Sequence, residues 1–198
     1  LRLSRGLGDV YKRQTVRCCT QNGVRGGSAT VHFPIWHQEI EDILVLKNNK
    51  GTEDNRVRKL DYSIQISKLF YERFIKNEDI TLFSPNNTPG LYEAFGMPEF
   101  DELYLKYEKD KSIPKSTIGA QELFMDLLKE RAETGRIYIM NIDHCNTHSS
   151  FKDKVYMSNL CQEITLPTTP IQHIDDKEGE IALCILSAIT LGLLTEID

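Results

Sequence analysis

The chain has 198 residues, a net charge of −5, and 40% hydrophobic and 27% charged residues. This length is enough to bury one sizeable core, and five scattered cysteines exclude a secreted disulfide scaffold and indicate a reducing, cytoplasmic location. The longest apolar stretch, Ile181 to Leu194, is shorter than the about 20 residues of a membrane-spanning helix, so it is expected to be buried core. An acidic chain argues against binding of nucleic-acid polymers, although a local pocket for a nucleotide is compatible with it.

Residues 1–14 are interpreted as a non-native segment. The stretch Ser4–Gln14 (SRGLGDVYKRQ) looks like the in-frame translation of a transposon adapter used in sequencing libraries, and a disordered basic N-terminus is the alternative. Either interpretation predicts that the segment is disordered and takes no part in the fold. Four basic residues in it stand against Asp9, so the remaining residues carry a net charge of −8.

Strands and helices are predicted to alternate along the rest of the chain. Strands are predicted at Ala29–Phe33, Asp61–Ile66, Ile80–Phe83, Arg136–Ile142, Cys161–Leu166 and Glu180–Leu186. Helices are predicted at Pro34–Leu46, from an N-cap at Ser67 to Lys76, at Glu99–Lys109 and at Ser116–Glu133, with turns at Ser84–Gly90 and Leu91–Phe95. This alternation is typical of parallel βαβ units, so the predicted fold class is α/β.

A glycine-rich stretch, Gln21–Gly27 (QNGVRGG), precedes the first predicted strand. Its spacing matches neither a P-loop nor a Rossmann fingerprint. Taken alone, the stretch predicts a flexible turn.

The stretch Asn159–Glu163 (NLCQE) carries the most distinctive chemistry. In an extended segment Asn159, Cys161 and Glu163 would face one side, because side chains of a strand repeat every two residues. A thiyl radical takes a hydrogen atom from carbon, a carboxylate accepts a hydroxyl proton and an amide holds hydroxyl groups, so the trio indicates radical reduction of a ribose. The alternative is that Cys161 is a small core residue.

The other cysteines are candidates for redox or metal chemistry. Cys184 lies on a second apolar segment and is a candidate half of a reducing thiol pair. The run His144–His148 (HCNTH) lacks a second Cys/His pair that would complete a four-ligand zinc site, so no metal site is predicted. Cys18 and Cys19 are adjacent in sequence and are therefore expected to be unpaired.

Longer stretches closely resemble the large, catalytic subunit of class I ribonucleoside-diphosphate reductases. The similar stretches run with little interruption from about Cys18 to about Gly192. They are Thr20–Thr30 (TQNGVRGGSAT), Leu44–Asn49 (LVLKNN), Ile80–Pro85 (ITLFSP), Thr134–Tyr138 (TGRIY), Asn141–His148 (NIDHCNTH), Ser158–Pro167 (SNLCQEITLP) and Gly179–Ala188 (GEIALCILSA).

The resemblance implies that residues 15–198 are part of a ten-stranded α/β barrel domain, with Cys161 on a loop or strand end inside the barrel. Cys161 would then form the thiyl radical, Glu163 would accept the 3′-hydroxyl proton and Asn159 would orient the hydroxyls, with Leu160 and Gln162 completing the substrate-binding stretch. Cys184 would be half of the redox disulfide, its partner lying outside this sequence.

The resemblance also implies a specificity loop, in which Gln21, Arg25, Gly26 and Gly27 relay the identity of a bound deoxynucleotide effector. Asn22 departs from the family pattern, where glycine is expected.

Partners follow from the same resemblance. The expected ones are a ribonucleoside diphosphate substrate, a metal-containing small (beta) subunit that supplies the radical, a second large subunit, thioredoxin or glutaredoxin, and deoxynucleotide or ATP effectors. No cofactor is expected to bind this stretch directly, and neither a nucleic-acid polymer nor a membrane is an expected partner.

Two alternatives stay open. A noncatalytic nucleotide-binding or interaction module with incidental cysteines would show the same glycine loop and strand–helix alternation. A cobalamin-driven reductase would share the trio, although the long-range similarity favours the class I subunit.

Overall fold

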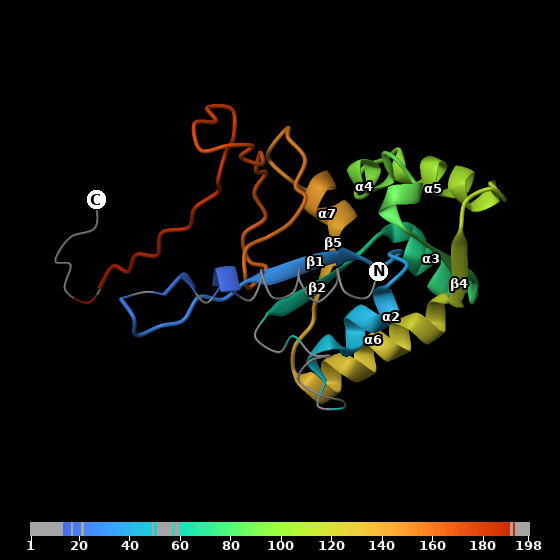
Figure 1. Cartoon of the computed structure of the whole chain (residues 1–198), viewed down its shortest axis with the longest axis horizontal. Coiled ribbons are helices and arrows are strands. Elements are labelled where there is room, and N and C mark those ends of the chain that lie inside the picture. The colour runs from blue at the N-terminus through green and yellow to red at the C-terminus, as the bar shows by residue number, and fades with distance from the viewer. Residues whose placement is uncertain are drawn as a thin grey trace.

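The computed structural model describes residues 14–16, 18–20, 22–48, 50, 57, 60–190 and 192. Two small sheets organise them (Figure 1): β1, β2 and β5 form a parallel sheet in the order β1-β2-β5, and β3 and β4 form an antiparallel pair. The strands are β1 (Thr30–Pro34), β2 (Asp61–Ile66), β3 (Asp79–Phe83), β4 (Lys115–Gly119) and β5 (Tyr138–Asn141). The helices are α2 (Ile40–Leu44), η1 (Val45–Lys47), α3 (Lys68–Lys76), η3 (Pro85–Asn87), α4 (Leu91–Ala94), α5 (Phe100–Lys109), α6 (Ala120–Thr134) and α7 (Ile142–Thr147).

One face of the parallel sheet is apolar and belongs to the main core. The β2 side chains Tyr62, Ile64 and Ile66 are each at most 4% exposed and join this core, together with Leu123 and Leu127 of α6. Helices α2 and α6 lie on one side of the sheet in Figure 1, and the segment that follows α7 lies on the other. Since side chains of a strand alternate between faces, the second face carries the remaining residues of each strand.

The sequence predicted the βα unit β2–α3 correctly. Strand β2 has the predicted bounds, and α3 begins directly after Ser67 and ends where Asn77 adopts a left-handed conformation with φ of 56°. The Ser67 side chain makes no capping bond. The Asp143 carboxylate accepts the Lys68 N–H at 2.5 Å instead, so α7 caps α3.

Two predicted helix starts were wrong. Pro34 is the last residue of β1 rather than the first of a helix, because the chain continues the ladder through Ile35 N–H to Gln65 O and then bonds to Phe83. The helix predicted from Ser116 begins at Ala120, because the preceding residues, Lys115–Gly119, pair with β3 as β4.

Two predicted strands near the site residues were also wrong. The stretch Cys161–Leu166 forms a turn followed by irregular chain, with Gln162 at a φ of 65°. The stretch Glu180–Leu186 contains a single isolated bridge, between Glu180 and Thr169. Parallel pairing is confirmed for β1, β2 and β5, whereas the β3–β4 pair is antiparallel.

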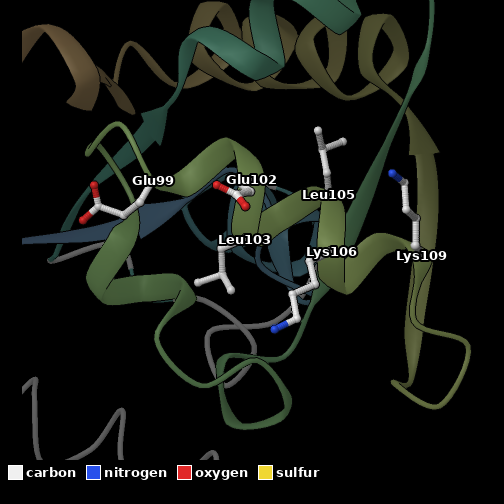
Figure 2. Close-up of a pocket in the computed structure, with 6 residues that line it drawn as sticks. All are labelled: Glu99, Glu102, Leu103, Leu105, Lys106 and Lys109. Carbon is white, nitrogen blue, oxygen red and sulfur yellow. The ribbon is translucent and has the colours of Figure 1, made fainter.

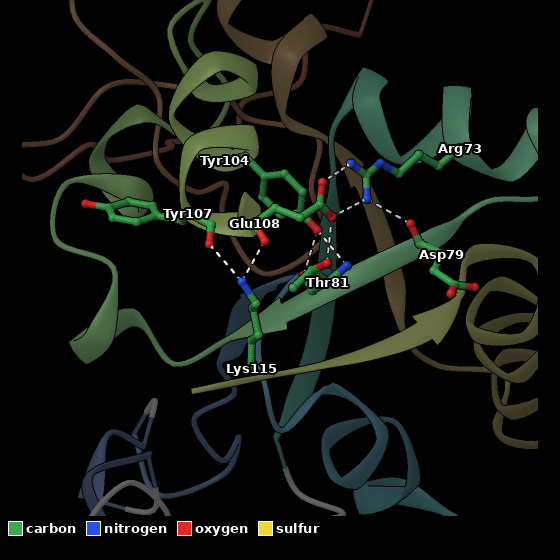
Figure 3. A network of polar contacts seen from close by, with 7 residues as sticks. All are labelled: Arg73, Asp79, Thr81, Tyr104, Tyr107, Glu108 and Lys115. Atoms are coloured by element: carbon green, nitrogen blue, oxygen red, sulfur yellow. Dashed lines mark hydrogen bonds and ion pairs between the residues drawn. The ribbon is translucent and has the colours of Figure 1, made fainter. Parts of the chain in front are cut away.

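A buried ionic network joins α3, β3 and α5 (Figure 3). The Arg73 guanidinium donates two hydrogen bonds of 2.6 Å to the Glu108 carboxylate and a third, of 2.8 Å, to the Asp79 carbonyl. The Thr81 hydroxyl donates to the same carboxylate at 2.6 Å, and the buried Tyr104 hydroxyl donates to the Thr81 carbonyl at 2.6 Å. These bonds satisfy charges that burial would otherwise penalise, so they fix α5 against β3.

The five described strands do not close into a barrel. The chain has mixed α/β content, as predicted. In the part of the chain that the structure describes, no helix combines the length and the apolar character that crossing a membrane requires.

Candidate active site

The segment from Tyr156 to Gln162 crosses the second face of the parallel sheet. Side chains of β1 and β2 hold it through main-chain carbonyls: Gln65 Nε2 donates to Tyr156 O at 2.6 Å, and Thr30 Oγ1 donates to Leu160 O at 2.8 Å. Between them, His32 Nε2 lies 3.2 Å from Ser158 O. A carbonyl only accepts, so Nε2 carries the proton. Burial lowers the pKa of His32, and the bond to Ser158 O opposes this shift without cancelling it. The net lowering favours the neutral imidazole.

The cysteine lies on a turn that Asn159 closes. Asn159 Oδ1 accepts the Ile164 N–H at 3.0 Å, and Asn159 O accepts the Gln162 N–H at 3.3 Å. The Ser158 hydroxyl spans the same turn, donating to Ile164 O at 2.7 Å. The predicted extended alternation of Asn159, Cys161 and Glu163 is therefore broken, because the turn carries Cys161 at its tip. Cys161 thus lies on a loop, one of the two placements that the resemblance implied, and its place inside a barrel stays a prediction.

Two side chains of the sheet lie next to the tip of the turn. Gln162 Nε2 donates to the buried Ser63 hydroxyl of β2. The Cys161 thiol interacts with the Tyr138 phenol of β5. The pKa of Tyr138 is raised, mainly because the phenol is desolvated and secondly because of this thiol. Ser63 and Tyr138 are register partners in the parallel sheet, so adjacent strands contact adjacent residues of the turn.

The other predicted site residues are partly brought together. Asn159 and Cys184 line one cavity of about 170 Å³ together with Ser158, Ile164 and Leu183. Cys161 and Glu163 are exposed and are not among the residues of that lining. All five cysteines are unpaired, as expected for Cys18 and Cys19.

The predicted specificity loop lies beside the cysteine turn. Arg25, Gly26 and Gly27 line a cavity of about 480 Å³ that Leu160 also lines. A Cβ on Gly27 would lie 2.4 Å from the carbonyl oxygens of Val16 and Cys19, so only glycine fits there without rearrangement. Gln21 lies outside the described residues.

Neither Cys161 nor Cys184 lines the two further hollows. His144 and Cys145 line a cavity of about 310 Å³ with Gln162, and the described residues contain no cluster of three or more potential metal ligands. A larger hollow, of about 660 Å³, lies along α5 (Figure 2). Its lining residues are Glu99, Glu102, Leu103, Leu105, Lys106 and Lys109, and no predicted site residue is among them.

Sequence reasoning missed the strand residues that hold the turn. Thr30 and His32 alternate with Val31 and Phe33 along β1, and Ser63 and Gln65 alternate with apolar residues along β2. This period-two pattern was a usable signal, because it predicts one polar face on an otherwise apolar sheet. Buried polar side chains need hydrogen-bond partners, and the segment Tyr156–Gln162 supplies one to each of these four residues, while Nδ1 of His32 has none.

Comparison with known proteins identifies relatives over nearly the whole chain. Residues 8–196 match the family model described as ribonucleotide reductase, barrel domain. The chain is 58% identical over 193 residues to the ribonucleoside-diphosphate reductase subunit alpha of Haemophilus influenzae, covering 95% of this chain and 26% of that protein. It is 59% identical over 161 residues to the ribonucleoside-diphosphate reductase 1 subunit alpha of Escherichia coli, covering 79% of this chain and 21% of that protein. It is 48% identical over 182 residues to the ribonucleoside-diphosphate reductase subunit alpha of Enterobacteria phage T4, covering 89% of this chain and 24% of that protein. The chain thus spans about a quarter of the length of these relatives.

Proposed function

This chain belongs to the ribonucleotide reductase barrel-domain family, and on that premise we propose that it is part of the catalytic subunit of a class I ribonucleoside-diphosphate reductase. The observation that carries the proposal is the Cys161 turn. It is held on the sheet beside Tyr138, and Asn159 of the same turn shares a cavity with Cys184. A noncatalytic module gives no reason for this arrangement, and the relatives are named as reductases.

The proposed reaction uses the residues in fixed order. The Cys161 thiyl radical takes the 3′ hydrogen atom of the ribose and becomes a thiol, while Glu163 accepts the 3′-hydroxyl proton and Asn159 holds the hydroxyls. The 2′-hydroxyl takes a proton from the dithiol pair of Cys184 and its partner thiol and leaves as water. The pair then gives a hydrogen atom to C2′ and one further electron to the sugar, becoming a disulfide, while Glu163 returns its proton to the 3′ oxygen. Cys161 then returns the hydrogen atom, so one ribonucleoside diphosphate and one dithiol give one deoxyribonucleoside diphosphate, one water and one disulfide.

The exposed thiol and carboxylate fit this proposal. Cys161 and Glu163 both face solvent, where a substrate can reach them. The cavity lined by Arg25, Gly26 and Gly27 supports a role of this loop in relaying effector identity, because Leu160 of the proposed substrate-binding stretch lines it too. Gln21 is proposed to act with Arg25 on the base.

The complete barrel and the partners are proposed for the longer alpha subunit of which this chain would be a part. The β1-β2-β5 sheet would be one part of the ten-stranded barrel, to which residues 15–198 belong. Residues 1–14 stay proposed as adapter-derived, although the family match begins at residue 8. The proposed partners are a metal-containing small subunit that generates the radical, a second alpha subunit, thioredoxin or glutaredoxin, and deoxynucleotide or ATP effectors, all in the cytoplasm.

A segment exchange tests the function. The matching region of the Haemophilus influenzae alpha subunit is replaced by residues 15–198 of this chain, and the hybrid is assayed with its small subunit and a dithiol. We expect the hybrid to form deoxyribonucleotide. Its Cys161→Ser variant should form none, because an alcohol O–H bond is too strong for the same hydrogen-atom transfer, and this variant should still bind substrate. Product formation by the Cys161→Ser hybrid would rule out the assigned role.

A further inference from the structure

A polar sheet face holds the cysteine turn. The face consists of Thr30 and His32 of β1 and Ser63 and Gln65 of β2; we call these four residues the polar face. Ser63 and Gln65 are at most 1% exposed, and the β1–β2 register pairs His32 with Ser63. Polar side chains this deeply buried are costly unless they are hydrogen-bonded, so their partners are structurally decisive.

Each residue of the polar face contacts a different point of one short segment. Gln65, His32 and Thr30 contact the carbonyls of Tyr156, Ser158 and Leu160 in chain order, over distances of 2.6 to 3.2 Å. Ser63 accepts from the Gln162 side chain. The contacts therefore bracket Cys161, with Leu160 fixed before it and Gln162 fixed after it.

Gln162 lies in a backbone conformation that needs support. Its φ is 65°, in the left-handed region that a residue with a side chain rarely adopts. A local conformation of this kind persists when the surrounding structure over-determines it, and the bond to Ser63 is such a restraint. This conformation sets the direction of the chain directly after Cys161.

We propose that the polar face is the positioning element of the active site, and that His32 and Ser63 fix the place of the Cys161 thiol without contacting the substrate. The proposal rests on the proposed function and adds to it, because it assigns roles to residues on two strands far from the cysteine in sequence. A hydrogen-atom transfer is sensitive to placement, since a shift of about 1 Å at a reacting group costs on the order of 100-fold in rate. Loss of one bond from the face should thus lower kcat and leave KM unchanged.

The first test measures the turn itself in the intact alpha subunit that carries this sequence. His32→Leu removes the donor to Ser158 O, and Ser63→Ala removes the acceptor for Gln162; His32→Gln keeps a donor, and Ser116→Ala is the matched control on β4. We expect amide exchange in residues 158–164 and alkylation of Cys161 to rise about fivefold in His32→Leu and Ser63→Ala, the factor that one neutral hydrogen bond provides. His32→Gln should restore both rates toward those of the unmodified protein.

The second test reads catalysis in the same variants. We expect kcat to fall about tenfold in His32→Leu and Ser63→Ala at unchanged KM, with partial recovery in His32→Gln. The exchange and alkylation measurements need no turnover, so failure of the reductase function and failure of the positioning role give different results. Unchanged exchange and alkylation at the turn, or exchange that rises equally in β3 and β4, would overturn the proposal, because the residues would then have no effect or only a general effect on stability.

Discussion

Arg73 and Glu108 join α3 to α5 through two parallel hydrogen bonds of 2.6 Å. The pair is largely buried, with side-chain exposures of 11% and 25%. Burial raises the pKa of Glu108, but the bonds from Arg73 and Thr81 outweigh it, and the net shift is downward. The folded state therefore holds this carboxylate ionised where an unfolded chain would begin to protonate it.

Replacing this carboxylate should destabilise the fold in a pH-dependent way. Glu108→Gln leaves the Arg73 charge without a counter-ion, and we expect a loss of about 2 kcal/mol at pH 7, less than for a fully buried pair because Glu108 is partly exposed. A group with a lowered folded pKa stabilises above its unfolded pKa and loses that contribution as the pH falls through the folded value. Urea unfolding from pH 7 to 3 should show the difference shrinking below about pH 4.5, while Glu102→Gln on the exposed side of α5 should change little.

Cys184→Ser should stop the proposed reaction at a different point from Cys161→Ser. Hydrogen abstraction by Cys161 could begin, but the pair that supplies two electrons would be incomplete. In the intact subunit we expect loss of the radical signal and breakdown of the substrate without deoxynucleotide, measured by electron paramagnetic resonance and product analysis. Normal repeated turnover would remove Cys184 from the reducing pair.

Arg25→Ala should disturb selection of the base and spare electron delivery. Arg25 is exposed and lines the cavity shared with Leu160, so its guanidinium is free to contact a base edge. The measurement is the ratio of products from the four substrates under each deoxynucleotide effector. Ratios identical to those of the unmodified subunit, with the protein folded, would leave the loop with a purely structural role.

The 198-residue chain made alone should form no deoxynucleotide with any dithiol. The proposed chemistry needs a second thiol for Cys184 and a surface for the small subunit, both of which lie outside this sequence in our proposal. The assay combines purified chain, substrate, a chemical dithiol and a radical-bearing small subunit. Sustained product would contradict the mechanism built on Cys184.

The same chain should be poorly soluble because of one apolar stretch. The expectation that this stretch is buried core was wrong for its described residues, because it extends away from the two sheets in Figure 1. Ile181, Leu183, Ile185, Leu186 and Ile189 are between 66% and 91% exposed. Contiguous exposed apolar side chains favour association. We expect strong binding of a hydrophobic dye and concentration-dependent aggregation, both reduced by Leu183→Lys with Ile185→Lys, whereas Lys152→Glu, a charge change elsewhere on the surface, should leave both unchanged.

Local signals predicted the fold where local interactions determine it. The bounds of β2 and the start of α3 after Ser67 could be read from residue types, although the bond that caps α3 comes from Asp143. The start of α6 was wrong because Lys115–Gly119 takes its conformation from a ladder with β3, a partner more than 30 residues away. Pairing of this kind leaves little trace in the periodicity of a single segment.

The site shows the same division. The trio Asn159, Cys161 and Glu163 is proposed as the site because its chemistry can be read from residue types. Its arrangement was wrong because the turn at Gln162 depends on a hydroxyl of β2 that lies 99 residues earlier. A sequence pattern alone does not give the direction of a side chain beyond a turn that tertiary contacts impose.

The contacts from Gln65, His32 and Thr30 all end on carbonyl oxygens, at every second residue of the segment that bears the cysteine. Every amino acid offers that oxygen, whatever its side chain. Substitutions at Tyr156, Ser158 and Leu160 therefore leave these anchors intact, while a change in the strands removes a donor. During divergence the side chains of the segment that bears the cysteine can therefore change without loss of these contacts. The donor side chains on β1 and β2 have to stay the same for the contacts to persist.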